Sequence, residues 1–127
     1  MGIERFSPAE LRPSDLYSHV VQAGSLLFVA GQVSQDADGH VVGVGDFQTQ
    51  AAQVFDNLSQ ALASVGASLR NLVKITIYIT DPRFRDPLRD VNRRYLPTDQ
   101  PTSTLLVVAG LARPEYLIEI DAIAALE

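Results

Sequence analysis

A change of hydrophobic period at residue 47 constrains the fold of this chain more than any other feature. From 47 to 65 the apolar residues recur at steps of three and four, which is the pattern of an amphipathic helix. Asp46 is placed to accept hydrogen bonds from the first-turn amides, and Gly66 stands where a left-handed residue ends a helix. The apolar positions are Phe47, Ala51, Val54, Phe55, Leu58, Leu62 and Val65. The sequence therefore predicts a helix over residues 47–65.

Short apolar runs before this helix are typical of antiparallel strands. Residues 17–23 and 26–30 are joined at 24–25 by Gly-Ser, a two-residue hairpin signal. A second turn signal, Asp-Gly, stands at 38–39, so we expect residues 40–43 to pair back as a third strand. The first part of the chain is therefore predicted to be an antiparallel meander.

Three further strands are predicted after residue 66. They cover 72–79, 102–109 and 117–125, and a loop that contains Arg113 and Pro114 links the last two as a hairpin. Side chains alternate between the two faces of a strand. The first of the three therefore separates Lys74 and Thr76 from Val73, Ile75 and Ile77.

A second, shorter helix is predicted to begin at Asp86. Aspartate is a good helix cap, and the proline that follows it is favoured at the first helical position. Leu88, Val91 and Tyr95 then form one apolar stripe. Two helices are thus available to cover a sheet.

The order of the elements indicates an α+β fold. Three strands, a helix, a strand, a helix and two strands fit a single domain over residues 1–127, with one mixed sheet and both helices on one of its faces. No helix remains for the second face, to which the last strand contributes Leu117, Glu119, Asp121 and Ile123. We therefore expect a homo-oligomer in which these sheets pack together.

Charge and composition exclude several classes of function. The net charge of −5 disfavours direct binding to nucleic acid or to anionic membranes, because both select basic surfaces. The chain has no cysteine, which excludes a disulfide, a thiolate nucleophile and a zinc–sulfur site. The charged N-terminal segment is unlike a signal peptide, and no apolar run approaches the ~20 residues of a membrane span. We expect a soluble cytoplasmic protein.

Glu119 and Asp121 are the first candidates for chemistry. Two residues apart on a strand, they share a face at a spacing of about 6.5 Å. If one carboxyl of such a pair is desolvated, its pKa rises and it can serve acid–base catalysis, whereas two solvated carboxyls merely line a sheet edge. The spacing alone leaves both interpretations open.

The remaining candidates are single residues. Tyr17 and His19 share a strand face, and His19 is either a proton acceptor or a structural histidine, whereas His40 beside a turn is expected to be exposed. Gly31 either lets a ligand approach the backbone or marks a bulge. No phosphate-binding glycine motif is present. No Gly-x-Ser-x-Gly elbow surrounds any serine, so Ser103 is not predicted to be a hydrolase nucleophile. We expect no metal site and no cofactor.

Four sequence blocks, in a fixed order, are specific enough to indicate a family. They are YSHVV…GSLLFVAGQV at 17–33, FDNLSQALASVGASLRNLVKITIYITD at 55–81, VNRRY at 91–95 and QPTSTLLVVAGLARPEYLIEIDAIA at 100–124. With them the chain resembles the Rid family (YjgF/RidA, reactive intermediate deaminases, also labelled endoribonuclease L-PSP). The resemblance implies a chorismate-mutase-like fold of the Bacillus type, assembled as a homotrimer with clefts between neighbouring subunits.

In the deaminating members of that family the cleft binds the carboxylate of a small imine or enamine, such as 2-aminoacrylate, and water releases ammonia. The resemblance carries four site residues over to this chain. Tyr17 matches a cleft tyrosine, and Gly31 matches a glycine whose backbone faces the ligand. Asn92 matches a cleft asparagine in the second helix, and Glu119 matches the glutamate that positions or activates the water.

One position departs from the pattern of the deaminating members. They have P-x-R-[ST] at the start of the fifth strand, and the arginine clamps the substrate carboxylate. Here residues 101–104 read P-T-S-T, so Ser103 stands where arginine belongs. We expect Ser103 and Thr104 to line a polar, uncharged pocket in which Glu119 has no cationic neighbour. Such a pocket favours neutral or cationic ligands over carboxylates.

Four functions remain open. The preferred one is a binding protein or regulator, a trimer that holds a small metabolite at the subunit interface and has lost the usual 2-imino acid deaminase activity. The second is an enzyme that acts on a neutral imine, with Glu119 as general base and Ser103 or Thr104 orienting the substrate. The third keeps deamination through a relocated arginine, such as Arg94 or Arg12. A ribonuclease comes last, because an acidic surface repels RNA.

Overall fold

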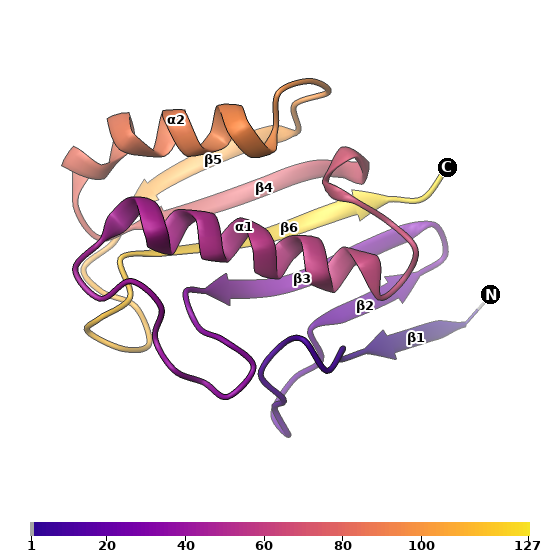
Figure 1. Ribbon diagram of the computed structural model, residues 1–127. Helices are drawn as coiled ribbons and strands as arrows, with labels where there is room; N and C mark the ends of the chain where they lie inside the picture. The colour runs from indigo at the N-terminus through magenta and orange to yellow at the C-terminus, as the bar shows by residue number, and fades with distance from the viewer. Residues whose placement is uncertain (1) are drawn as a thin grey trace.

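Six strands form one mixed sheet in the computed structural model, which describes residues 2–127 (Figure 1). The strands are β1 (Ile3–Phe6), β2 (Val20–Ala23), β3 (Leu26–Val33), β4 (Leu72–Ile79), β5 (Thr102–Val107) and β6 (Ile118–Ala125). Their spatial order is β1-β2-β3-β6-β4-β5. All neighbours in the sheet are antiparallel except β4 and β5, which are parallel.

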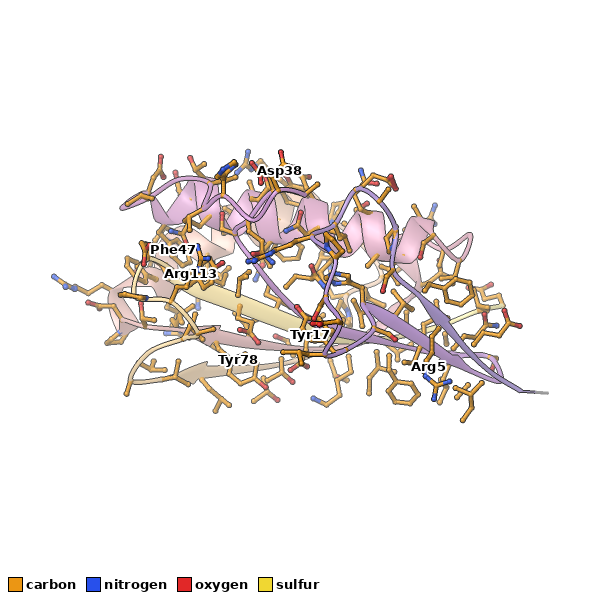
Figure 2. All side chains as sticks on the ribbon, turned by 90° about the horizontal axis from the view of Figure 1, so that it is seen from below. Arg5, Tyr17, Asp38, Phe47, Tyr78 and Arg113 are labelled. Carbon is orange, nitrogen blue, oxygen red and sulfur yellow. The ribbon has the colours of Figure 1, made fainter. Side chains whose placement is uncertain are left out.

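Both α-helices lie on the same face of this sheet (Figure 1, Figure 2). The helix α1 (Phe47–Ala63) follows the β1–β3 meander, and α2 (Arg85–Tyr95) connects the parallel strands β4 and β5. Parallel neighbours require such a crossover, because a tight turn joins only antiparallel strands. Two short 3-10 helices, Leu69–Asn71 and Pro82–Phe84, precede β4 and α2. This is the α+β arrangement that the sequence predicts.

The first helix begins and ends at its sequence signals. Asp46 caps the N-terminus, where its Oδ1 accepts a hydrogen bond from the Thr49 amide at 3.1 Å. At the C-terminus Gly66 takes a left-handed conformation with φ 74°, and its amide donates to the Ala63 carbonyl at 3.1 Å. The helix stops at Ala63 rather than at residue 65, because this capping turn takes up the last positions. No helix in the described part of the chain has both the length and the apolar character that crossing a bilayer requires.

The hydrophobic core lies between the helices and the sheet. Phe55 of α1 is fully buried and stacks on Tyr95 of α2 with ring centroids 5.0 Å apart, which ties the two helices together. The central strands contribute alternate side chains, as the sequence predicts. Those of β4 and β6 that are buried include Ile75, Ile77, Ile79, Ile118, Ile120, Ala122 and Ala124.

The strand predicted at 40–43 is wrong. This segment is a loop with one isolated bridge, between Gln35 and Val41, and the additional strand of the meander is β1 near the N-terminus. Gly43 is left-handed, with φ 76°, which interrupts an extended run. β1 was missed because Glu4 and Arg5 make up its centre, and charged residues do not signal a strand.

The second helix begins before the predicted Asp86. The same Asp-Pro signal occurs earlier, where Asp81 Oδ1 accepts a hydrogen bond from the Arg83 amide at 2.9 Å and Pro82 enters the first turn. The chain forms a 3-10 turn there and continues into α2 at Arg85 without a second side-chain cap. Both Asp-Pro pairs can begin a helix. The chain uses the earlier pair, which follows β4 directly.

The strands after α1 differ from prediction in two respects. The pairing of β4 with β6 shifts register between Leu72 and Lys74, so Val73 is 44% exposed and does not share the buried face of its strand. β5 and β6 are not neighbours, because β4 lies between them. The loop that contains Arg113 is therefore a connection across β4 and not a hairpin.

The face of the sheet that carries no helix is partly apolar, as the alternation of β6 predicts. Tyr78 of β4 projects from this side of the sheet (Figure 2). The side chains of Leu26, Phe28 and Leu106 belong to the same face and are 41–44% exposed. Apolar surface of this extent favours association with another chain.

We expect Phe55→Ala to lower the free energy of unfolding by about 3–5 kcal/mol, because it removes a buried ring and leaves a cavity between the helices. Urea denaturation followed by circular dichroism measures the change. Val44→Ala is the control, since Val44 is 68% exposed and its truncation should alter the free energy by less than about 0.5 kcal/mol. Equal midpoints for Phe55→Ala and the wild type would contradict this placement of the core.

Candidate functional site

Glu119 lies against a glycine at an irregular point of the sheet. The pairing of β3 with β6 shifts register between Val29 and Gln32, so β3 bulges at Ala30 and Gly31. The Glu119 side chain covers Gly31 so closely that a β-carbon there would overlap Glu119 Oε2 and lie 2.9 Å from Glu119 Cδ. The missing side chain at Gly31 is what gives the Glu119 carboxyl its room.

A hollow of about 330 Å³ opens beside this pair. It is lined by Tyr17, Ala30, Gly31, Val33, Ala112 and Glu119. A larger adjoining hollow of about 720 Å³ also contains Tyr17 and adds Arg12 and Arg113. The structure therefore brings three predicted site residues, Tyr17, Gly31 and Glu119, to one surface.

The two carboxyls of β6 have different settings. Burial raises the pKa of the Glu119 carboxyl above its ordinary value, and the negative charge of Asp121 raises it further. Asp121 accepts a hydrogen bond from the Tyr78 hydroxyl at 2.9 Å, and this bond raises the pKa of Tyr78. Of the two interpretations that the spacing leaves open, a desolvated carboxyl beside a fixed charge is therefore the one that describes Glu119.

Ser103 lies in a second cavity, between β5 and α2 on the helix side of the sheet. The cavity has a volume of about 280 Å³ and is lined by Ile75, Arg89, Asn92, Arg93, Leu96, Gln100, Pro101 and Ser103. Asn92 is half-buried, and its Oδ1 is buried without a hydrogen-bond partner among the residues that the structure describes. Two more of the predicted residues, Asn92 and Ser103, are thus brought together.

The structure corrects the prediction of an uncharged pocket at Ser103. Two arginines, Arg89 and Arg93, are among the residues that line the cavity, and no acidic residue between 2 and 127 lines it. Residues four apart lie on the same face of a helix, and Asn92 belongs to that face as well. This spacing is visible in the sequence, but whether the two arginines line the cavity of Ser103 depends on which side of α2 lies against β5.

The two arginines that the sequence suggested as replacements lie elsewhere. Arg94 is on another side of α2, where it lines hollows next to α1 and the end of α2. Arg12 lines the large hollow beside Tyr17. Neither contributes to the cavity of Ser103.

Thr104 does not line the cavity that contains Ser103. Successive strand residues point to opposite faces, and Thr104 is in register with Thr76 of β4, on the side without helices. Thr102 is on that side too, and its hydroxyl donates to the Val73 carbonyl at 3.0 Å. The three consecutive hydroxyl residues therefore do not form the floor of one pocket within a protomer.

The two groups of predicted site residues lie on separate parts of the protomer. Tyr17, Gly31 and Glu119 belong to the surface around β3 and β6, whereas Asn92 and Ser103 belong to α2 and the edge strand β5. Two strands, β6 and β4, separate β3 from β5, and the two cavities share no lining residue. One protomer alone does not gather these five residues into one site.

His19 is a buried structural residue. It is 1% exposed, and its Nε2 lies 2.6 Å from the Arg12 carbonyl while its Nδ1 lies 3.1 Å from Gln32 Nε2. Because the Gln32 amide can only donate from that atom, Nδ1 accepts from Gln32 and Nε2–H donates to the Arg12 carbonyl. His19 precedes β2, so it shares no strand face with Tyr17, although the two rings meet edge to face at 5.5 Å.

His40 is exposed, as expected, and lies beside two aspartates. Candidate ligand atoms of Asp36, Asp38 and His40 lie within 4.8 Å of one another, a grouping that was not predicted. Asp36 Oδ1 accepts hydrogen bonds from the amides of Asp38 and His40, each at 2.9 Å, and these bonds, chiefly that from His40, lower the pKa of Asp36. The Asp36 carboxylate thus stabilises the turn by accepting its backbone amides, and we assign no metal to it.

Comparison with known proteins connects this geometry to a family. The family model described as Endoribonuclease L-PSP matches residues 7–126. The chain belongs to this family, the Rid family. Its six-stranded mixed sheet with two helices is therefore the Rid fold, which agrees with the resemblance in the sequence.

Several Rid relatives match along almost the whole chain. A RutC family protein of Pyrococcus horikoshii is 33% identical over 113 residues, which are 89% of each protein. The 3-aminoacrylate deaminase RutC of Acinetobacter baylyi is 29% identical over 118 residues, 93% of this chain and 90% of that one. The crystal structure of the Rid family protein YyfA from Yersinia pestis superimposes with a TM-score of 0.92 at 25% identity, covering 98% of this chain and 100% of its own.

We expect Glu119→Gln to raise the free energy of unfolding at neutral pH. The raised pKa means that the folded chain binds a proton at Glu119 more tightly than the unfolded chain, so stability falls as pH rises through that pKa. The advantage of the variant should vanish on acidification below the ordinary glutamate pKa, where both states are protonated. Thermal unfolding between about pH 4 and about pH 8 measures this.

Glu4→Gln, at an exposed position of β1, is the control for this measurement and should behave like the wild type at every pH. An advantage of Glu119→Gln that grows on acidification would contradict the raised pKa.

Proposed function

We propose that this protein binds a small imine or enamine and hydrolyses it, with Glu119 as the acid–base group. The observation that carries the proposal is a half-buried carboxyl of raised pKa, held over Gly31 at the wall of a hollow that contains Tyr17. A carboxyl with a pKa nearer neutrality exchanges protons with water and substrate more effectively. A relative at 29% identity bears the name 3-aminoacrylate deaminase, an activity of this class.

The proposed chemistry uses water and one proton carrier. As water adds to the imine carbon, Glu119 takes a proton from it and delivers that proton to the nitrogen, which gives a carbinolamine. Glu119 then moves the hydroxyl proton to the same nitrogen, which leaves as ammonia while the C=O bond forms. An enamine first takes a proton at carbon and loses one from nitrogen, which gives the imine. These steps require no cofactor.

We further propose that the site is completed in a homotrimer. The helix-free apolar face, to which Phe28 belongs, supports association, because such a surface is rarely left in water. The separation of the two groups of site residues supports a shared cleft. In this arrangement Tyr17 and Glu119 of one protomer face the Ser103 cavity of its neighbour, and the ligand lies between them.

A second candidate is binding without turnover. Ser103 favours it, because a hydroxyl has neither the charge nor the two-pronged geometry with which arginine holds a carboxylate. The protein would then hold a small metabolite at the subunit interface as a regulator, without the usual 2-imino acid deamination. We do not propose the RNA cleavage that the family description names, since the net charge of −5 disfavours RNA.

Ammonia release from freshly generated 2-iminopropionate and 3-aminoacrylate distinguishes the two candidates. We expect the wild type to exceed the uncatalysed rate and Glu119→Gln to lose about 100-fold or more. Gly31→Ala should act in the same direction, because its β-carbon displaces the Glu119 carboxyl. Glu4→Gln should leave the rate unchanged. A wild type no faster than the uncatalysed reaction would exclude turnover of these substrates and favour the binding role.

Sedimentation equilibrium tests the assembly. We expect the wild type to have the mass of a trimer and Phe28→Glu to give smaller species, because an unpaired carboxylate cannot be buried in an apolar contact. Val44→Glu is the matched control, since Val44 is exposed in the loop before α1. A wild type that remains monomeric would remove the shared cleft.

A further inference from the structure

Two arginines give the Ser103 cavity a positive charge within a chain whose net charge is −5. Arg89 and Arg93 lie about one helical turn apart on α2. The other lining residues are uncharged: Ile75, Asn92, Leu96, Gln100, Pro101 and Ser103. A hollow lined by one sign of charge raises the local concentration of the opposite charge. The cavity is therefore suited to a small anion.

Arg89 is the more available of the two cations. Arg93 lies 3.5 Å from Asp90 Oδ1, and both side chains of this ion pair are exposed. Arg89 forms no salt bridge with any residue between 2 and 127. Its guanidinium can therefore offer two parallel hydrogen bonds to a carboxylate, the geometry in which arginine binds anions best.

Two polar groups stand beside this cation. Ser103 contributes a hydroxyl to the cavity, and a hydroxyl can donate one hydrogen bond to an anion oxygen. Asn92 Oδ1 is buried and has no partner within the described residues. An amide oxygen accepts hydrogen bonds, so it requires a donor and takes no part in holding an anion.

Arg12 and Arg113 are weaker candidates for the same task. They line the large hollow beside Tyr17, but Asp15 lines it as well and offsets part of their charge. That hollow contains neither of the polar groups that accompany Arg89.

We propose that Arg89 binds a carboxylate of the ligand and thereby takes the place of an arginine at position 103. The inference rests on the proposed function only in placing the ligand at the Ser103 cavity. It narrows the substrate class to small imines and enamines that carry a carboxylate, in place of the neutral or cationic ligands expected from the sequence. Arg93 adds to the attraction, and neither arginine takes part in the proton transfers.

Binding of pyruvate, a stable carboxylate, and of pyruvamide, its uncharged analogue, tests this inference by isothermal titration calorimetry at low salt. We expect the wild type to bind pyruvate about tenfold or more tightly than pyruvamide. Arg89→Gln should lose about tenfold or more of its affinity for pyruvate and keep its affinity for pyruvamide. Arg94→Gln makes the same charge change on another side of α2 and should bind both probes like the wild type.

The double variant Arg89→Gln/Ser103→Arg provides a rescue. A guanidinium on β5 should restore the affinity for pyruvate. If Arg89→Gln had instead damaged the fold or the assembly, the second substitution would not restore that affinity. Unchanged pyruvate affinity in Arg89→Gln, or a wild type that does not prefer pyruvate to pyruvamide, would overturn the inference.

Glu119→Gln separates this inference from the proposed function. It should abolish most ammonia release while pyruvate still binds. If pyruvate binding depends on Arg89 but Glu119→Gln releases ammonia at the wild-type rate, the acid–base proposal fails and the anion site stands. If ammonia release depends on Glu119 but pyruvate binding does not depend on Arg89, the anion site fails and the acid–base proposal stands.

Discussion

The parallel pairing of β4 with β5 is the constraint on which the arrangement of the candidate site depends. A parallel neighbour cannot be reached by a tight turn, so the intervening chain crosses one face of the sheet as α2. This crossover places α2 against the helix side of β5, to which Ser103 points. Arg89, Asn92 and Arg93 therefore meet Ser103 because of the topology of the sheet, although the two elements are separate in sequence.

The other half of the site depends on a side chain that is absent. β3 bulges where it passes β6, and Glu119 occupies the space that a β-carbon at Gly31 would fill. Burial and the charge of Asp121 both disfavour the ionised Glu119 carboxyl, while Tyr78 holds Asp121 in place by a hydrogen bond. The arrangement opposes stability at neutral pH and favours proton exchange, which is a common compromise at sites that carry out chemistry.

Most of the fold could be predicted because its signals are local. The period of α1, its caps at Asp46 and Gly66 and the alternation of β6 each concern residues close together in sequence. Prediction failed where pairing partners decide the outcome, as at the bulge of Val73, or where a signal such as Asp-Pro occurs twice. The site residues came from resemblance, but the charge of their surroundings depends on which face of α2 packs against β5. That contact is tertiary, so Arg89 could not be assigned from the sequence.

β5 is also an outer strand of the sheet, and this position has a further consequence. Its free edge presents unpaired backbone groups, and Leu106 and Val107 beside it are 44% and 54% exposed. An uncovered apolar edge is a template for strand addition and aggregation, which proteins usually prevent with charges or a cover. The opposite edge, β1, carries Glu4 and Arg5, whereas β5 has no charged residue. The solubility of an isolated protomer and the shape of its anion cavity thus depend on the same short strand.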